Sequence, residues 1–157
     1  MKKILLVYYS RTGTTKKLAE KISAGLACDV EEIFDAVDRS GPGGYILAGR
    51  DATLKRLTAL KPVKFDPADY DLVIIGTPVW AWNVSTPIRT YLTVNKDKFK
   101  SVAFFCTSGG TPGENIFKYM SNITGLNPTT MLDLTTREVI NGGFEKRLKE
   151  FAGKAIK

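Results

Sequence analysis

The chain of 157 residues is 43% hydrophobic, has a formal net charge of +7 and contains no histidine. Its length and apolar content fit one domain with a sizeable core, so we expect a single domain over residues 1–157. The absence of histidine excludes histidine-ligated zinc, Ser-His-Asp triads, Cys-His dyads and haem with a proximal histidine. Chemistry must therefore come from carboxylates, hydroxyls, backbone amides or a bound cofactor.

Five segments have the composition of β-strands. Three are continuous apolar runs, which is typical of parallel strands buried on both faces: residues 4–9, 72–76 and 102–106. The segment 29–33 is shorter and more polar, which suits an edge strand. Residues 131–134, after Pro128, are predicted to form a fifth strand.

Helical patterns lie between and after these strands. Leu18, Ile22 and Leu26 recur every four residues, a second helix follows Pro87, and residues 116–123 carry a third apolar stripe. A last helix is expected to open at 141–143. Strands that alternate with helices predict an α/β fold, with a doubly wound, five-stranded parallel sheet and helices on both faces.

The connection between the second and third strands is unusually long. It spans residues 34–70, with a glycine-rich bend at 41–44 followed by a helix. We expect this helix to bury Ile46, Leu47, Leu54 and Leu57 and to expose Arg50, Lys55 and Arg56. A long connection is often functional, but a covering helix with generous flanking turns explains it equally well.

A hydroxyl-rich loop follows the first strand and opens a helix. It consists of Ser10, Arg11, Thr12, Gly13, Thr14 and Thr15. Unpaired N–H groups at a helix N-terminus attract anions, and the hydroxyls add donors, so the loop predicts a phosphate site. It lacks the glycine and lysine spacing of a Walker A loop and the three glycines of dinucleotide folds, which favours a phosphate monoester. The alternative is a Ser/Thr-rich helix cap without a ligand.

Two more loops follow the third and fourth strands, at the edge where such sheets bind ligands. The first consists of Thr77, Pro78, Val79, Trp80, Ala81, Trp82 and Asn83. The second consists of Thr107, Ser108, Gly109 and Gly110. Both tryptophans are expected in a turn rather than in a strand, which favours contact of at least one of them with a flat ligand over core packing.

These loops resemble those of flavodoxins and flavodoxin-like proteins. Ser10-x-Thr12-Gly13-x-Thr15 after a buried strand is similar to the family's FMN-phosphate loop, and residues 76–83 are similar to its ring-binding loop. Residues 107–110 also fit, and the resemblance covers nearly the whole chain in the right order. It implies a flavodoxin-like sheet with strand order 2-1-3-4-5, FMN as the cofactor and a cofactor site built from the residues of all three loops.

The resemblance implies a redox function with two variants. One is electron transfer to a redox partner protein, and the other is NAD(P)H-dependent reduction of a small quinone-like acceptor. The loop 108–114 has no aromatic residue where many flavodoxins have one, so one ring face is open to a substrate or covered by another element, such as the segment around Tyr45. The alternative is a flavin-free module that binds a phosphometabolite or acts in regulation.

Composition also constrains location and partners. The apolar runs are far shorter than the roughly 20 residues of a membrane span, and no signal-peptide cleavage site follows the first run, so we expect a cytoplasmic protein. Cys28 and Cys106 are expected to be buried free thiols. The basic residues alternate with acidic ones, as in 145–150, which indicates a solvated face rather than a nucleic-acid-binding surface.

Overall fold

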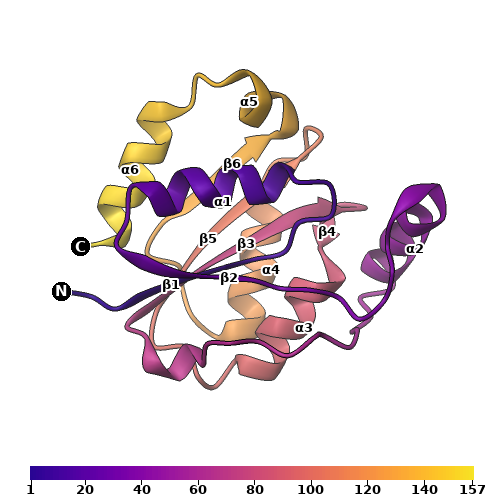
Figure 1. Cartoon of the computed structure of the whole chain (residues 1–157), viewed down its shortest axis with the longest axis horizontal. Helices are drawn as coiled ribbons and strands as arrows, with labels where there is room; N and C mark the ends of the chain where they lie inside the picture. Colours follow the sequence, from indigo (N-terminus) through magenta and orange to yellow (C-terminus); the bar gives the residue numbers. More distant parts are fainter.

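The computed structural model describes residues 1–157 and has a parallel β-sheet at its centre. The parallel strands are β1 (Ile4–Tyr8), β2 (Cys28–Glu32), β3 (Leu72–Trp80), β5 (Val102–Ser108) and β6 (Met131–Thr135). Their order is β2-β1-β3-β5-β6, and a two-residue strand, β4 (Asn83–Val84), pairs antiparallel with β3. Counted without β4, this is the expected order of a doubly wound sheet, and the fold prediction is confirmed (Figure 1).

The central strands are buried because both faces of the sheet are covered. Every residue of β1 and β5 is buried, whereas β2, at the edge, is only partly covered. Successive side chains of a strand point to opposite faces, so Leu5 and Val7 join one apolar cluster while Ile4 and Leu6 join another. The continuous apolar runs in the sequence reflect this two-sided burial.

Helices cover each face of the sheet. One layer contains α1 (Thr14–Ala24), α5 (Thr136–Asn141) and α6 (Glu145–Ala155), and the other contains α3 (Thr86–Asn95) and α4 (Glu114–Thr124). A short 3-10 helix, Pro67–Asp69, precedes β3. Figure 1 shows α1 in front of the sheet and α4 behind it. No helix is both long and apolar enough to cross a membrane.

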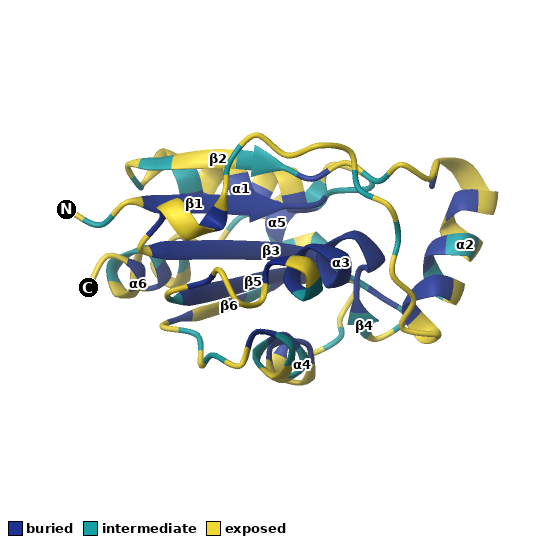
Figure 2. Cartoon of the chain, turned by 90° about the horizontal axis from the view of Figure 1, so that it is seen from below, coloured by how far each residue is buried: buried dark blue, intermediate teal, exposed yellow.

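The helix in the long connection, α2 (Gly41–Thr53), stands at the carboxyl edge of the sheet (Figures 1 and 2). The expectation about its buried face was wrong. Ile46, Leu54 and Leu57 are 71%, 55% and 54% exposed, and Leu47 is half-buried. The helix packs instead through residues that recur at every fourth position and include no large apolar side chain: Gly44, Ala48 and Ala52, together with Asp51. Small residues let the helix backbone approach its neighbours closely, which leaves the large side chains outside.

Three smaller expectations also differ from the structure. Trp80 is the last residue of β3 rather than part of a turn. A separate helix, α5, precedes the expected C-terminal helix, which begins at Glu145 rather than at 141–143. Cys106 is fully buried, and burial, reinforced by Asp133, raises the pKa of its thiol to about 12, but Cys28 is only half-buried.

Candidate functional site

A single large pocket opens at the carboxyl edge of the sheet, between the three loops and α2. Its volume is about 890 Å³, within the range typical of small-molecule sites. The expected site residues in its lining are Ser10, Arg11, Thr12, Thr14, Thr15, Pro78, Val79, Trp80, Ala81, Trp82, Thr107, Ser108 and Gly109. Gly13, Thr77, Asn83 and Gly110 do not line it. The structure therefore brings all three loops to one cavity.

The loop between β1 and α1 presents free donors to this pocket. Gly13 has φ 100°, a left-handed conformation that suits glycine, and its N–H donates to the Ser10 hydroxyl at 3.0 Å. No side chain caps the first N–H groups of α1, and the hydroxyls of Thr12 and Thr14 have no protein partner. Such an uncapped helix start is suited to an anion.

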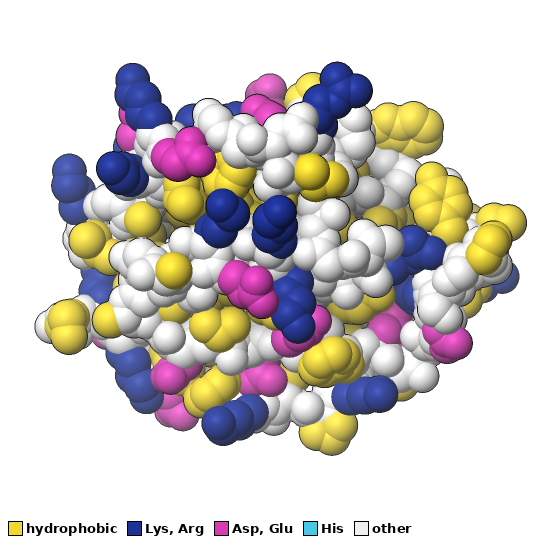
Figure 3. Space-filling model, turned by 45° about the horizontal axis from the view of Figure 1, so that its top comes forward, with side chains coloured by type: hydrophobic (Ala, Val, Ile, Leu, Met, Phe, Trp, Pro, Cys, Tyr) yellow, Lys and Arg dark blue, Asp and Glu magenta, His cyan; other side chains and the backbone are white.

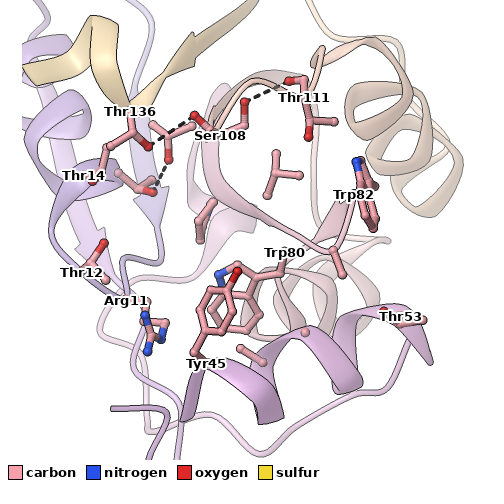
Figure 4. A pocket seen from close by; sticks show the side chains of 18 of the residues that line it. Arg11, Thr12, Thr14, Tyr45, Thr53, Trp80, Trp82, Ser108, Thr111 and Thr136 are labelled. Carbon is pink, nitrogen blue, oxygen red and sulfur yellow. Dashed lines mark hydrogen bonds between the residues drawn. The ribbon is translucent and has the colours of Figure 1, made fainter. Parts of the chain in front are cut away.

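Thr15 joins two of the loops. Its hydroxyl is hydrogen-bonded to that of Thr107 at 2.8 Å, and both residues are buried. This bond links the start of α1 to the end of β5 across the strand-order reversal. Thr15 therefore sets the spacing of the loops, and Thr12 and Thr14 lie in the lining of the same pocket (Figure 4).

The β3–β4 hairpin places its two tryptophans in different environments. Its two-residue turn consists of Ala81 and Trp82, with φ 46° and 60°, and Asn83 donates its side-chain N–H to the Ala81 carbonyl at 2.9 Å. Left-handed backbone at two non-glycine residues is strained, and such strain is concentrated at functional sites. The turn leaves Trp82 77% exposed at the pocket. Trp80 is only 9% exposed and packs edge-on against Tyr9, with ring centroids 5.4 Å apart.

Thr77 packs inside the fold and does not line the pocket. It is fully buried, and its hydroxyl accepts a hydrogen bond from the Ser85 N–H at 3.1 Å. This contact holds the start of α3 against β3. The expectation that Thr77 touches a ligand has no support in this geometry.

The third loop is tightly folded. The Ser108 hydroxyl donates to the Thr111 carbonyl at 2.9 Å and accepts from the Gly110 N–H at 3.2 Å. The Thr136 hydroxyl donates to the Ser108 carbonyl at 3.3 Å (Figure 4). Sequence reasoning missed Thr111 and Thr136 in the lining. Thr136 directly follows β6, so the rule that ligands bind beyond strand ends also points to it.

Sequence reasoning named the segment around Tyr45 only as one element that could cover the ring and assigned none of its residues to the site, yet this segment forms an entire wall of the pocket. The wall is formed by α2 and the residue after it: Tyr45, Ile46, Ala48, Gly49, Arg50, Thr53 and Leu54. This position explains why Ile46 and Leu54 are exposed, because they face the cavity instead of the core. Figure 3 shows apolar side chains gathered at the α2 end of the molecule. The length of the connection was the available signal.

The pocket is electrostatically one-sided. Arg11 and Arg50 are the only charged residues in its lining, and no carboxylate lines it. Arg50 is partly neutralised by Asp51, with an N···O distance of 3.1 Å. The free N–H groups of α1, in a lining without negative charge, favour an anionic ligand.

The comparisons with known proteins agree with this architecture. Residues 50–153 match the model of a family described as flavodoxin, which is well over half of the chain. The chain belongs to the flavodoxin family. A flavoprotein from Lactobacillus acidophilus NCFM, solved in complex with FMN, shares 30% identity with it and superposes with a TM-score of 0.73, covering 90% of this chain and 98% of that one.

Two further structures support the flavodoxin fold. A protein from Bacteroides eggerthii DSM 20697 is 25% identical, with a TM-score of 0.77 over 100% of this chain and 99% of the other. Two-electron reduced flavodoxin from Megasphaera elsdenii is 19% identical, with a TM-score of 0.63 over 97% and 99%. This last likeness concerns the fold alone.

A buried ion-pair network anchors α2 to the body of this flavodoxin-family protein. The Arg39 side chain is 2% exposed; it donates to Asp35 and, at 3.0 Å, to Asp51 in α2. The same guanidinium lies 5.5 Å from the ring centroid of Trp80. Burial alone would raise the pKa of Asp51, but hydrogen bonds from Arg39 and Arg50 outweigh it and hold this pKa below its ordinary value.

Acid should loosen α2 through Asp51. Because the folded-state pKa of Asp51 lies below its ordinary value of 3.8, its ionised form stabilises the fold above that pH. This contribution is lost as the pH falls through the lower folded-state pKa. We expect the urea-unfolding free energy of Asp51→Asn to decline less between pH 7 and pH 3 than that of the unaltered protein. Equal declines would contradict this role.

Proposed function

We propose that this chain binds FMN in the pocket and uses it for oxidation–reduction, either as an electron carrier or as an NAD(P)H-dependent reductase of quinone-like acceptors. One observation carries the proposal. A single cavity has an uncapped, hydroxyl-rich helix start on one side and exposed aromatic and aliphatic side chains on the others, with no carboxylate in its lining. A phosphate monoester joined to a flat ring matches both parts.

The residues present fit FMN. Thr12 and Thr14, with the first N–H groups of α1, would hold the phosphate, and Trp82 has an exposed ring for the flavin. A β-carbon at Gly49 on α2 would meet nothing within 4 Å, so there is open space beside this wall. The 30% identical flavoprotein solved with FMN supports the same assignment.

The protein's part in the chemistry is binding and electrostatic control. Bound FMN would supply the exchange of one or two electrons. The lining contains no carboxylate, lysine or cysteine, and its one phenol belongs to Tyr45. The apolar walls would exclude water, and the free N–H groups at the start of α1 would favour negative charge on the ligand. We further propose a cytoplasmic location, because both cysteines are free thiols.

A visible absorption spectrum of the purified protein, before and after addition of FMN, tests the proposal. We expect flavin bands that remain with the protein during gel filtration. A colourless protein that does not retain FMN would contradict the proposal and favour a flavin-free phosphometabolite-binding module. Steady-state NAD(P)H oxidation by the loaded protein separates the two redox roles, because a pure carrier shows no turnover with small acceptors.

Removing a hydroxyl of the first loop should weaken phosphate binding selectively. A hydrogen bond to a charged group contributes about 1.5–3 kcal/mol, so Thr12→Ala and Thr14→Ala should each raise the Kd for FMN at least about tenfold. Riboflavin lacks the phosphate, and its Kd should not change. Titration monitored by flavin fluorescence measures both constants.

The matched control is Thr53→Ala, which removes a hydroxyl from the α2 wall of the same pocket. It should leave the preference for FMN over riboflavin unchanged. Equal losses for FMN and riboflavin in Thr12→Ala and Thr14→Ala would show that the loop does not hold the phosphate.

A further inference from the structure

Arg11 lies in the hydroxyl-rich loop, but its side chain is bonded to the start of α2. Its Nε donates to the Arg39 carbonyl at 2.9 Å, and its Nη2 donates to the Gly41 carbonyl at 2.8 Å. Its guanidinium lies 5.6 Å from the ring centroid of Tyr45. Two of these contacts join the loop to α2, which begins 30 residues later in the chain, and the third joins the loop to the segment just before α2.

The position of Arg11 in the loop suggests that it binds the phosphate. These contacts direct its guanidinium toward α2 instead. Two of its five N–H donors are already satisfied by backbone carbonyls, and a guanidinium is rigid and planar. Figure 4 shows Arg11 next to Tyr45, with Thr12 and Thr14 farther along the loop. The free hydroxyls and N–H groups at the helix start remain available for the phosphate.

Tyr45 presents a large, open aromatic face to the same pocket. It is 71% exposed although it lines the cavity. Tyr45, Gly49 and Thr53 follow one another at every fourth position of α2, so they share a face of the helix. Gly49 adds no side chain beside the ring, and a β-carbon there would meet nothing within 4 Å. This face of α2 can therefore receive a flat group.

The other aromatic residues of the lining do not duplicate Tyr45. Trp80 is nearly buried between Tyr9 and Arg39, and Trp82 lies on the hairpin, on a different side of the pocket (Figure 4). The loop between β5 and α4 carries no aromatic residue. Tyr45 thus offers a second exposed aromatic surface, on the α2 side of the pocket.

We propose that Tyr45 packs against the flavin ring and that Arg11 is a positioning residue, which holds Tyr45 and the first turn of α2 in place and does not bind the phosphate. This inference rests on the proposed binding of FMN. It assigns part of the ring site to α2, outside the three strand-end loops.

Riboflavin and FMN distinguish the two roles of Arg11, because only FMN has the phosphate. We expect Arg11→Gln to raise the Kd for both ligands by the same factor, about tenfold. Tyr45→Ala should do the same and should shift the visible absorption of bound flavin toward that of free flavin. Tyr45→Phe, which keeps the ring, should restore both the affinity and the spectrum.

The double variant Arg11→Gln/Tyr45→Ala should bind FMN no more weakly than Tyr45→Ala alone. The reason is that both substitutions remove the same contact, that of the Tyr45 ring with the flavin. Selective loss of FMN binding in Arg11→Gln would overturn the inference and make Arg11 a phosphate ligand. Unchanged affinity in Tyr45→Ala would overturn it as well. If the unaltered protein binds neither flavin, the proposed function itself fails. Both side chains lie outside the core, so we expect each variant to retain the fold. Thermal unfolding of each variant checks this.

Discussion

Gly44→Ala should displace α2 and weaken flavin binding by at least about tenfold, with a loss of about 1–3 kcal/mol in stability. A β-carbon at Gly44 would lie 2.0 Å from the carbonyl carbon of Arg39 and 2.1 Å from its oxygen. Arg39 cannot yield easily, because its side chain is bonded to Asp35 and Asp51 and its carbonyl accepts from Arg11. The helix must move instead, and the pocket wall moves with it.

The neighbouring residue provides the control for this substitution. Gly43 lies in the same helix, and a β-carbon there would meet nothing within 4 Å. Gly43→Ala should therefore retain the Kd for FMN and stabilise the protein slightly, since alanine favours helix over glycine by up to about 1 kcal/mol. Urea unfolding and flavin titration measure both effects. Equal behaviour of the two variants would show that close packing at Gly44 does not determine the position of α2.

Gly76→Ala should destabilise the sheet itself. Gly76 lies in β3, directly opposite Phe105 of β5, and a β-carbon there would lie 2.0 Å from the Cζ of that ring. Phe105 is fully buried, so its ring has no free volume to enter. Overpacking of this kind costs about 1–3 kcal/mol, which should appear as a lower urea midpoint with an unchanged m-value.

A substitution of Phe105 tests whether the clash with its ring causes the loss of stability in Gly76→Ala. Phe105→Leu alone should destabilise the protein, because it leaves a cavity in the core. In the Gly76→Ala background the smaller side chain makes room for the added methyl group, so the double variant should be more stable than the sum of the single effects predicts. Additive losses would show that the two residues do not compete for the same space.

The parallel strands and the position of the three loops could be predicted because local patterns determine them, whereas the strand order was implied by the resemblance to flavodoxins. The apolar runs at 4–9, 72–76 and 102–106 are long enough to be buried strands and are separated by helical patterns. Right-handed crossovers and the rule that ligands bind at a strand-order reversal then place the loops at one edge. All three loops line one pocket in the structure.

The α2 wall could not be predicted from the same patterns. Ile46 and Leu54 have the spacing of a buried helix face, yet they face the pocket, because Gly44, Ala48 and Ala52 make the close contact with the core. Hydrophobic spacing identifies an apolar face but not what that face covers. A ligand site and a protein core present the same pattern.

The two tryptophans illustrate a similar limit. They lie two residues apart in one hairpin, but Trp80 ends a strand and packs on Tyr9, whereas Trp82 stands in a left-handed turn and is exposed. Their different environments depend on where β3 ends and on how the two-residue turn twists. Neither is encoded in the tryptophans themselves.

The amino-acid sequence by itself determined the doubly wound sheet, the edge that carries the site and the hydroxyls available for a phosphate, because these follow from short-range periodicity and chain topology. Only the tertiary structure decided which residues complete the pocket. Arg11 bonds to carbonyls of Arg39 and Gly41, far along the chain, and Tyr45 lines the cavity because small residues anchor its helix. Such contacts depend on long-range packing, which no local pattern specifies.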